Sequence, residues 1–376
     1  MKLSCLQENL SKGLSIVGRA VPSRTTMPIL GNVLMATDQG QLKLAATNLE
    51  LSIVHWVGAR VETEGEITVP ARNFIDLVNS LPPEQVDMDI DTSSLSMALS
   101  CGAVNASFRG ITAEEFPVVP DPEEGDGFAV EAGDLRKGLG QVTFAASSDE
   151  GHAVLTGVLA EFEGETLTLA AADGFRLSVR HIPMIHPVPH PFNVIIPARA
   201  LSELMRIIGS QEEPVSISTT HPHNQILFQL EDTVLNSQLI DGHFPDYRRI
   251  IPSSHRLTLV LGRTEFLQAC KRAEIFARDV AYIVKLTISE NEMVVSADSS
   301  ESGQGSTRLT ATVEGEDVES GLEIAFNVRF LIDVLSALET PQVRLELTEA
   351  TNPGVIKGIG NDDFVHVVMP MHLGRR

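Results

Sequence analysis

The chain has 376 residues, of which 43% are hydrophobic, so it can build two or three separate cores. No run of about 18 apolar residues occurs, which excludes a membrane-spanning helix. The N-terminus lacks the apolar segment of a signal peptide, so we expect a cytoplasmic protein. The net charge of −22, taken alone, argues against a polyanionic partner. Cys5, Cys101 and Cys270 are too few and scattered for a disulfide framework or a zinc cluster, and they predict buried, reduced thiols.

Six segments predict helices, because their apolar residues recur every three or four positions. In chain order they cover residues 6–20, 70–81, 132–146, 197–209, 262–278 and 327–338. In the first segment, Leu6, Leu10 and Leu14 fall on one face. Pro70 and Pro197 suit a first helical turn, where a missing N–H costs nothing.

The segments between the predicted helices alternate with a period of two, as at Leu42 and Leu44. Short strands separated by turn signals such as Asp241-Gly242 and Asn361-Asp362 are typical of antiparallel sheet. The fold class we expect is therefore α+β, with helices over one face of a sheet.

One nine-residue pattern occurs three times, at steps of about a third of the chain. It spans residues 69–77, 196–204 and 326–334, which makes Arg72, Arg199 and Arg329 equivalent. A second marker, Thr47-Asn48, returns as Ala172-Asp173 and Ala297-Asp298. A domain-sized repeat predicts three tandem domains of similar fold, each with two helices, and favours a symmetric scaffold over a single catalytic pocket. With polar, turn-rich joints after residues 120 and 252, we expect domains at 1–122, 123–254 and 255–376.

Charge is distributed unevenly along the sequence. The six predicted helices contain 12 Lys and Arg against 7 Asp and Glu, so they carry +5 and the rest of the chain carries −27. If these helices share one face, that face is basic and the remaining surface is acidic. Such a distribution is typical of a protein that holds a polyanion on one surface only, although ordinary solvated helices remain the simpler alternative.

Several short strings are more specific than these patterns. They are Pro28-Ile-Leu-Gly-Asn32, Thr47-Asn-Leu-Glu50, Val69-Pro-Ala-Arg72, Asp173-Gly-Phe-Arg-Leu177, Phe244-Pro-Asp-Tyr-Arg-Arg249, Phe326-Asn327 and Val368-Met-Pro-Met-His-Leu373. On these strings, and over its whole length, the chain resembles the bacterial sliding clamp family, the β subunit of the replicative DNA polymerase III. The resemblance implies a non-catalytic processivity factor of the DNA-clamp fold. Two chains would close head to tail as a homodimeric ring around duplex DNA, which is held without regard to base sequence.

The resemblance also implies three sets of site residues. By position, the DNA-facing residues are Arg24, Arg72 and Arg199, and the charge pattern adds Lys271, Arg272 and Arg278; a structural salt bridge is the alternative for each. The expected dimer contacts are Ala106 and Phe108 on one chain with Ile275 and Phe276 on the other. A hydrophobic pocket for partner peptides would be formed by Leu155, Gly174, Phe175, Leu177, Pro245, Ile250, Val367, Met369, Pro370 and Met371, with Arg176 and Asn327 nearby.

The partners implied are the polymerase α subunit, the clamp loader, translesion polymerases and mismatch-repair proteins, which dock through short linear motifs. Two methionines give such a pocket an adaptable wall. The sequence departs from the family pattern at Ala172, Phe175, Phe330 and His372, where Thr, His, Tyr and Arg are usual. These departures predict a more apolar pocket and put hydrogen bonds at its rim in doubt.

Other chemistry is weakly supported. No phosphate-binding Gly-x4-Gly-Lys-Ser/Thr motif, nucleophile elbow or Cys-x2-Cys pair occurs, so we expect no cofactor and no metal. The run Asp87-Met-Asp-Ile-Asp91 alternates, which favours the solvated face of a strand. His181, His186 and His190, or His221 and His223, could approach a metal, but histidines of proline-rich loops are the simpler interpretation. An enzyme with an acidic metal site at Asp173, Asp246 and Asp298, or a peptide-binding scaffold that does not use DNA, remain the rival hypotheses.

Overall fold

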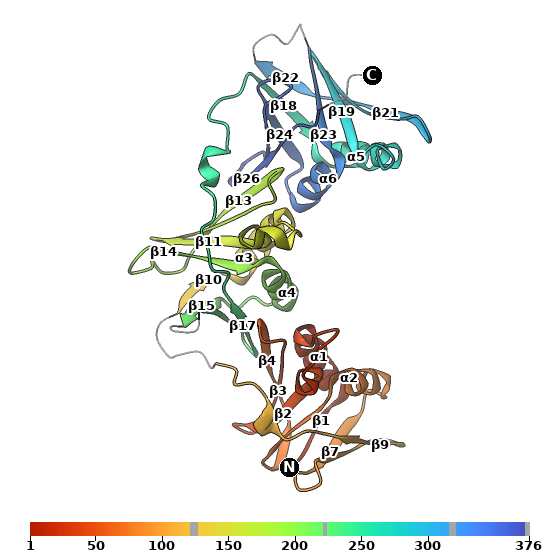
Figure 1. The fold of residues 1–376 in the computed structure, drawn as a ribbon, viewed down its shortest axis with the longest axis vertical. Helices are drawn as coiled ribbons and strands as arrows, with labels where there is room; N and C mark the ends of the chain where they lie inside the picture. The colour runs from red at the N-terminus through yellow and green to blue at the C-terminus, as the bar shows by residue number, and fades with distance from the viewer. Residues whose placement is uncertain (121–126, 221–223, 316–320, 373–376) are drawn as a thin grey trace. The chain divides into compact units, whose positions relative to one another are not determined.

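All six predicted helices form (Figure 1). The computed structural model describes residues 1–120, 127–220, 224–315 and 321–372. The helices are α1 (Gln7–Val17), α2 (Ala71–Ser80), α3 (Ala132–Val142), α4 (Ala198–Ile208), α5 (Arg263–Ala277) and α6 (Val328–Ala337). The predicted position of Pro70 was wrong by one residue. It ends a strand and caps α2 with φ −55° and ψ 111°, because its extended backbone still belongs to the sheet.

The chain divides into two compact units. Unit 1 comprises residues 1–133 with 203–239, and unit 2 comprises residues 134–202 with 240–376. None of the described helices is long and apolar enough to cross a bilayer. The segment 121–126, within the first expected joint, and His221 and His223 lie outside the described residues.

Two antiparallel sheets form unit 1. The five-stranded sheet has the order β5 (Arg60–Thr63), β1 (Lys2–Leu6), β7 (Gln85–Asp91), β8 (Ser96–Cys101) and β9 (Val104–Arg109). The eight-stranded sheet has the order β10 (Phe128–Val130), β15 (Val215–Thr220), β16 (Gln225–Gln229), β17 (Thr233–Gln238), β4 (Leu51–Val57), β3 (Gln41–Thr47), β2 (Asn32–Asp38) and β6 (Glu66–Pro70).

Two further antiparallel sheets form unit 2. The nine-stranded sheet has the order β14 (Phe192–Pro197), β11 (Gly157–Glu163), β12 (Thr166–Ala172), β13 (Arg176–Pro183), β26 (Asn361–Val368), β25 (Gly354–Gly358), β24 (Gln342–Leu347), β18 (Leu257–Gly262) and β22 (Thr312–Gly315). The four-stranded sheet has the order β21 (Gly303–Thr310), β20 (Glu292–Ser299), β19 (Ile283–Ser289) and β23 (Leu322–Asn327).

The repeat seen in the sequence is a repeat of strand triplets. In chain order, the first helix of each repeat is followed by β2-β3-β4, β11-β12-β13 or β19-β20-β21. The second helix is followed by β7-β8-β9, β15-β16-β17 or β24-β25-β26. The last strands of these triplets pair across repeats, β4 with β17 and β13 with β26. We call these pairings the first and second junctions. Among the described strands, β9 and β21 are the triplet ends left at the edges of their sheets.

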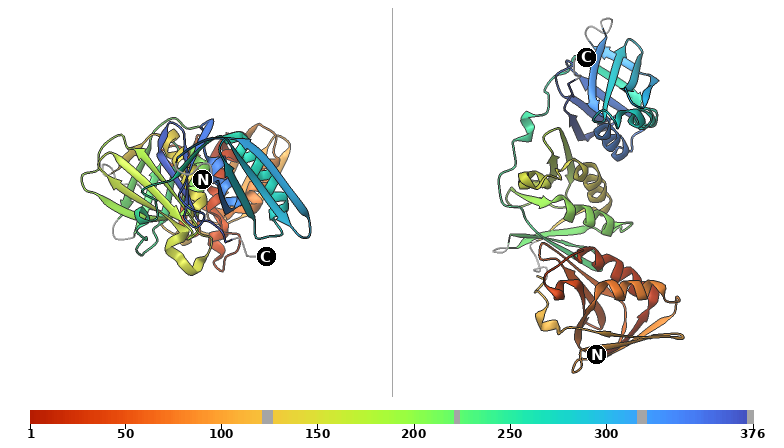
Figure 2. Two further views of the ribbon diagram at one scale, coloured as in Figure 1. Left: turned by 90° about the horizontal axis from the view of Figure 1, so that it is seen from above. Right: turned by 45° about the vertical axis from the view of Figure 1, so that its right-hand side comes forward.

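In each unit a helix pair lies side by side against the sheets, α1 with α2 in unit 1 and α5 with α6 in unit 2 (Figures 1 and 2). Leu10, Leu14 and Val17 of α1 are fully buried as predicted, whereas Leu6, predicted on the same face, ends β1 and is 57% exposed. Gly13 lets α1 approach the sheet, because an added Cβ would lie 2.7 Å from Val57 and 2.9 Å from His55. A larger residue at position 13 would push the helix away from its core.

Most local predictions are confirmed, and one turn was misplaced. All three cysteines are buried and unpaired, and burial raises the pKa of Cys5 to about 12, which makes its thiol inert. The strand β7 alternates between exposed and buried residues, so its three aspartates share the solvent face as expected. Asn361-Asp362, in contrast, begins β26, because the preceding Gly360 takes the positive φ of 78° that the turn requires.

Both junctions contain a buried histidine that bonds to a hydroxyl group directly opposite. His55 of β4 bonds to Thr233 of β17 at 2.8 Å, and His366 of β26 bonds to Ser178 of β13 at 2.8 Å. Burial lowers the pKa of His55 to about 4, with Asp232 opposing the shift and Lys12 adding to it. Burial, helped by the charge of Arg176, lowers the pKa of His366 to about 3. Both junctions therefore form with neutral imidazoles.

We expect stability to fall as the pH drops from about 6.5 towards 4. The unfolded chain binds a proton at His55 near pH 6.5, whereas the folded chain does so only near 4. The stabilisation is therefore complete above pH 6.5, and at pH 4 up to about 3 kcal/mol is lost for this histidine. Calorimetry between pH 7.5 and 4 should show a smaller loss for His55→Gln than for wild type. His190→Gln, at an exposed histidine, is the control and should leave the pH profile unchanged.

Candidate functional site

The six predicted DNA-facing residues are all exposed. Arg24 lies in the loop after α1, Arg72 and Arg199 lie in the first turns of α2 and α4, and Lys271 and Arg272 lie on α5. Arg278 caps the end of α5. None of the six takes part in an ion pair between described residues, so the structure gives no support to the salt-bridge alternative.

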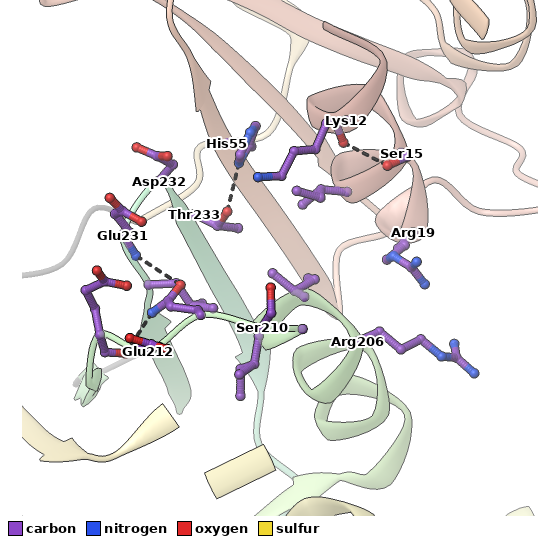
Figure 3. Close-up of a pocket in the computed structure, with 17 residues that line it drawn as sticks. Lys12, Ser15, Arg19, His55, Arg206, Ser210, Glu212, Glu231, Asp232 and Thr233 are labelled. Atoms are coloured by element: carbon purple, nitrogen blue, oxygen red, sulfur yellow. Dashed lines mark hydrogen bonds between the residues drawn. The ribbon is translucent and has the colours of Figure 1, made fainter. Parts of the chain in front are cut away.

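Two other helix arginines in unit 1 are engaged. Glu203 of α4 accepts from Arg19 at 3.0 Å and from Arg206 at 2.8 Å. A depression of about 590 Å³ lies beside them, with both arginines at one end and Glu212, Glu231 and Asp232 at the other (Figure 3). Opposite charges line this depression, so it does not form an anion site.

Residues of the predicted partner site come together in unit 2. In the second junction Leu177 lies opposite Val367, and both belong to one buried cluster with Phe244 and Tyr247, against which the partly buried Leu155 packs. The backbone fixes the segment after β26, because Met369 N–H donates to Phe175 O at 2.8 Å and Met371 N–H donates to Ala325 O at 2.8 Å. Met369, Pro370 and Met371 are half-buried.

Apolar side chains are exposed next to this cluster. Phe175 is 59% exposed and Ile250 is 38% exposed, and Pro245 is exposed beside the buried Phe244. Gly174 has a φ of 88°, which residues with a side chain rarely adopt. This tight turn presents Phe175 to solvent. An exposed aromatic group beside an apolar cluster is the expected character of a surface that binds apolar anchors.

Arg176 and Asn327 hold the structure around this surface and contribute little of it. Asn327 caps α6, since its side chain accepts from Arg329 N–H at 3.0 Å. Arg176 has an 11% exposed side chain that donates to Asp173 at 2.9 Å, to Asp333 at 2.6 Å and to the Phe144 carbonyl at 2.6 Å. Its guanidinium group also lies 4.4 Å from the Phe330 ring centroid and 5.4 Å from that of Phe144. We therefore describe Arg176 as a strut between β13 and α6.

The sequence alone missed the partners of Arg176. Asp333 occupies the acidic position of the nine-residue repeat, and its counterpart Glu203 also binds arginines. That shared position was an available signal. Phe330, one of the departures, stacks on the guanidinium group and makes no hydrogen bond through a hydroxyl group, so the departure changes the strut more than the rim. Ala172 is 7% exposed, within the cluster, and His372 is exposed.

Two of the predicted dimer residues lie on the edge strand β9, and the other two lie on helix α5, which packs beside the edge strand β21. Ala106 and Phe108 belong to β9, and the Phe108 ring packs edge-on against Phe74 at 5.4 Å between centroids. Ile275 is 57% exposed on α5, and Phe276 lies so close to β21 that a Cβ on Gly305 would approach it within 2.5 Å.

The rival acidic metal site does not form. Asp173 pairs with Arg176 and Asp246 with Arg249, and the described part of the chain contains no group of three or more His, Cys, Asp or Glu that could hold a metal.

Comparison with known proteins gives the same architecture along the whole chain. Models of the DNA polymerase III beta subunit match in three parts, its N-terminal domain at residues 1–120, its central domain at 129–246 and its C-terminal domain at 248–372. The Beta sliding clamp of Synechococcus elongatus is 35% identical, with 99% of this chain and all of that protein covered. The Beta sliding clamp of Escherichia coli K12 is 32% identical over the same shares.

Solved structures agree with the sequence comparison. The DNA polymerase sliding clamp from Bacillus subtilis superposes with a TM-score of 0.92 at 28% identity, covering 99% of each chain. A sliding clamp from Pseudomonas aeruginosa, bound to griselimycin, gives a TM-score of 0.91 at 30% identity and covers 99% of this chain and 100% of its own.

Three similar α+β domains joined through their sheets, with cationic helices, define a DNA sliding clamp. The chain belongs to the DNA polymerase III beta subunit family. In that family it is a non-catalytic processivity factor, and its partners are DNA and the polymerase.

Replacing Arg176 by Met should lower the stability of unit 2 by about 2–3 kcal/mol. A fully buried ion pair that loses one partner costs roughly 3–5 kcal/mol, and the 40% exposure of Asp333 reduces that cost. Calorimetric melting tests this expectation. The matched control is Arg249→Met, whose pair with Asp246 is 86% and 51% exposed and should contribute less than about 1 kcal/mol. If the two substitutions lower the stability equally, Arg176 does not stabilise the contact between β13 and α6.

Proposed function

We propose that two copies of the chain close head to tail into a ring of six domains that encircles duplex DNA. The domain boundaries within each copy lie at residues 1–122, 123–254 and 255–376. The observation that carries the proposal is the pairing rule of the triplets. Each junction joins the last strand of a first triplet to the last strand of a second triplet, as β4 with β17 and β13 with β26. The same rule applied between copies pairs β21 with β9.

This closure suits the residues at both edges. A pairing of β9 with β21 satisfies two rows of backbone N–H and C=O groups that an exposed edge leaves open to aggregation. It also brings Ala106 and Phe108 towards Ile275 and Phe276 of the partner subunit, and burial of the exposed Ile275 stabilises the contact. The contact is heterologous, and it closes after two copies.

DNA retention in such a ring is topological, so the contacts with DNA can be few and weak. Arg24, Arg72 and Arg199, with Lys271, Arg272 and Arg278, would meet phosphate groups and leave the bases unread. Weak phosphate contacts let the ring slide, whereas the charge of −22 keeps DNA away from the remaining surface.

The apolar surface at the second junction would hold the partners to the ring. Peptides with apolar anchors would dock against Leu155, Leu177, Pro245, Ile250 and Val367, between the Gly174–Phe175 turn and the Met369–Met371 segment. The polymerase α subunit, the clamp loader, translesion polymerases and mismatch-repair proteins would use it in turn. A protein that encircles DNA for the replicative polymerase would be located in the cytoplasm.

The first test concerns ring closure. Ile275→Asp with Phe108→Asp should give monomers, because two carboxylates would have to be buried unpaired at the interface. Sedimentation or light scattering measures the mass, and Ile185→Asp at another exposed apolar residue is the control and should leave the dimer intact. A double variant that keeps the mass of the dimer would place the interface elsewhere.

The second test concerns DNA. After loading by a clamp loader and ATP, the protein should stay on a nicked circle through a salt wash and leave when the circle is linearised. Arg24→Glu, Arg72→Glu and Arg199→Glu together should reduce loading several-fold with an unchanged dimer mass, because phosphate attraction becomes repulsion.

The charge-matched control for this test reverses three arginines outside the predicted helices, Arg60, Arg256 and Arg344. It should load nearly as well as wild type. Equal losses in both variants would show that net charge, and not the DNA-facing residues, controls loading.

The third test concerns the partner surface. Met369→Ala with Met371→Ala removes much of one wall and should weaken a peptide carrying Gln, Leu and Phe anchors by roughly ten- to a hundredfold, or about 1–3 kcal/mol. Fluorescence anisotropy measures the affinity, and unchanged melting excludes unfolding. Met205→Ala on α4 is the control. Wild-type affinity in the double variant would disprove this location of the partner site.

A further inference from the structure

The hydrogen bonds that fix the backbone at the second junction recur at the first junction. Asn48 Oδ1 accepts from the N–H groups of Glu50 and Leu51 at 3.0 and 2.7 Å. Asp173 Oδ1 accepts from the N–H groups two and three positions later at 2.9 and 3.0 Å. Glu50 O then accepts from Gln238 N–H at 2.8 Å, as the corresponding carbonyl of the second junction accepts from Met369 at 2.8 Å.

The buried apolar cluster beneath each junction, which we call its floor, is repeated as well. At the first junction one buried cluster includes Leu30, Val54, Phe116 and Val234. Of the corresponding residues at the second junction, Val179 and Phe244 belong to the cluster beneath the proposed partner surface, and the partly buried Leu155 and Val365 pack against it. Both floors are thus made of equivalent residues at equivalent strand positions.

Three exposed apolar side chains lie close in sequence to residues of this first cluster. Met27 is 45% exposed, Leu49 is 46% exposed and Val118 is 95% exposed. In the repeat, Leu49 corresponds to Gly174 and Val118 to Ile250, two residues of the partner surface. Leu49 also has a φ of 78°, which costs a residue with a side chain roughly 1 kcal/mol or more, and glycine avoids that cost. This strained, exposed leucine donates its N–H to Thr47 and accepts from Gln238 through its carbonyl, and its conformation is unfavourable for the isolated chain.

The two copies differ in polarity. At the first junction Glu50, Ser52, Asn236 and Gln238 stand where the second has Phe175, Leu177, Val367 and Met369. Glu114 and Glu115 directly precede Phe116 of the floor and are exposed. No ion pair between described residues involves Glu50, Glu114 or Glu115, and the cation nearest to Met27 in sequence is Arg24. The first junction therefore combines the exposed apolar side chains of Met27, Leu49 and Val118 with polar strand residues and three exposed carboxylates.

We propose that the first junction is a second docking surface, which binds a short, extended, basic peptide with an aliphatic anchor. The anchor would pack against Met27, Leu49 and Val118, and lysine or arginine residues beside it would pair with Glu50, Glu114 and Glu115. Charge would select the ligands of this surface, because its exposed carboxylates attract a basic peptide and repel an acidic one. The inference rests on the proposed partner surface at the second junction.

A selection of displayed random short peptides on the full-length dimer tests this inference. Each recovered peptide is measured against wild type, Leu49→Gly, Glu50→Lys, Met369→Ala with Met371→Ala, and the control Ile185→Ser. We expect one class of basic peptides that loses at least about tenfold affinity with Leu49→Gly and Glu50→Lys only. Bound peptide should slow amide hydrogen exchange in residues 48–53 and 234–238.

Leu49→Gly is informative because glycine relieves the strain at this turn. Its melting temperature should equal or exceed that of wild type, so loss of peptide binding cannot be attributed to unfolding. If the selection returns only peptides that depend on Met369 and Met371, the second docking surface is excluded and the proposed function stands. If the selection returns only peptides whose binding depends on Leu49, the proposed partner surface at the second junction is contradicted. If no peptide depends on either junction, both proposals fail.

Discussion

Backbone hydrogen bonds between strands of successive repeats are the interaction on which the other features depend. A triplet that ended in an open edge would expose a row of N–H and C=O groups, and pairing β4 with β17 and β13 with β26 satisfies them inside the chain. Because each junction continues a sheet, residues that face each other across its paired strands are buried. That burial requires neutral His55 and His366, and it forms the two apolar floors.

The same strand pairing assembles the candidate partner site from distant parts of the sequence. Arg176 lies opposite Val368, so the turn before β13 meets the segment after β26. The Phe175 carbonyl then holds Met369, and the Arg176 strut fixes the turn to α6 through Asp333. Shape at this surface depends on the register of one strand pair, and a slip by one residue would turn Leu177 and Val367 away from the cluster.

Local periodicity predicted the six helices and the antiparallel strands, and the recurrence of one nine-residue pattern predicted the threefold repeat. Apolar residues recurring along α1 or alternating along β7 record which face is buried. Which strands pair across repeats is a long-range choice that no local spacing records. For the same reason the contacts of Arg176 with Asp333 and Phe144 were missed, although its position near the partner surface followed from the family resemblance. The prediction of a turn at residues 361–362 was wrong because Gly360, one position earlier, adopts the positive φ that the turn requires.

Charge at the helices shows how a chain of −22 can work on DNA. Glu203 pairs with both Arg19 and Arg206, so its single negative charge offsets one of their two positive charges. The exposed cations left without ion pairs among the described residues, such as Arg72 and Arg199, are few and spread over separate helices. Affinity from phosphate contacts grows with the number of contacts, so under the proposed function so few cations would bind DNA weakly at physiological salt. Closure around the duplex, and not the strength of these contacts, then has to keep the protein on DNA.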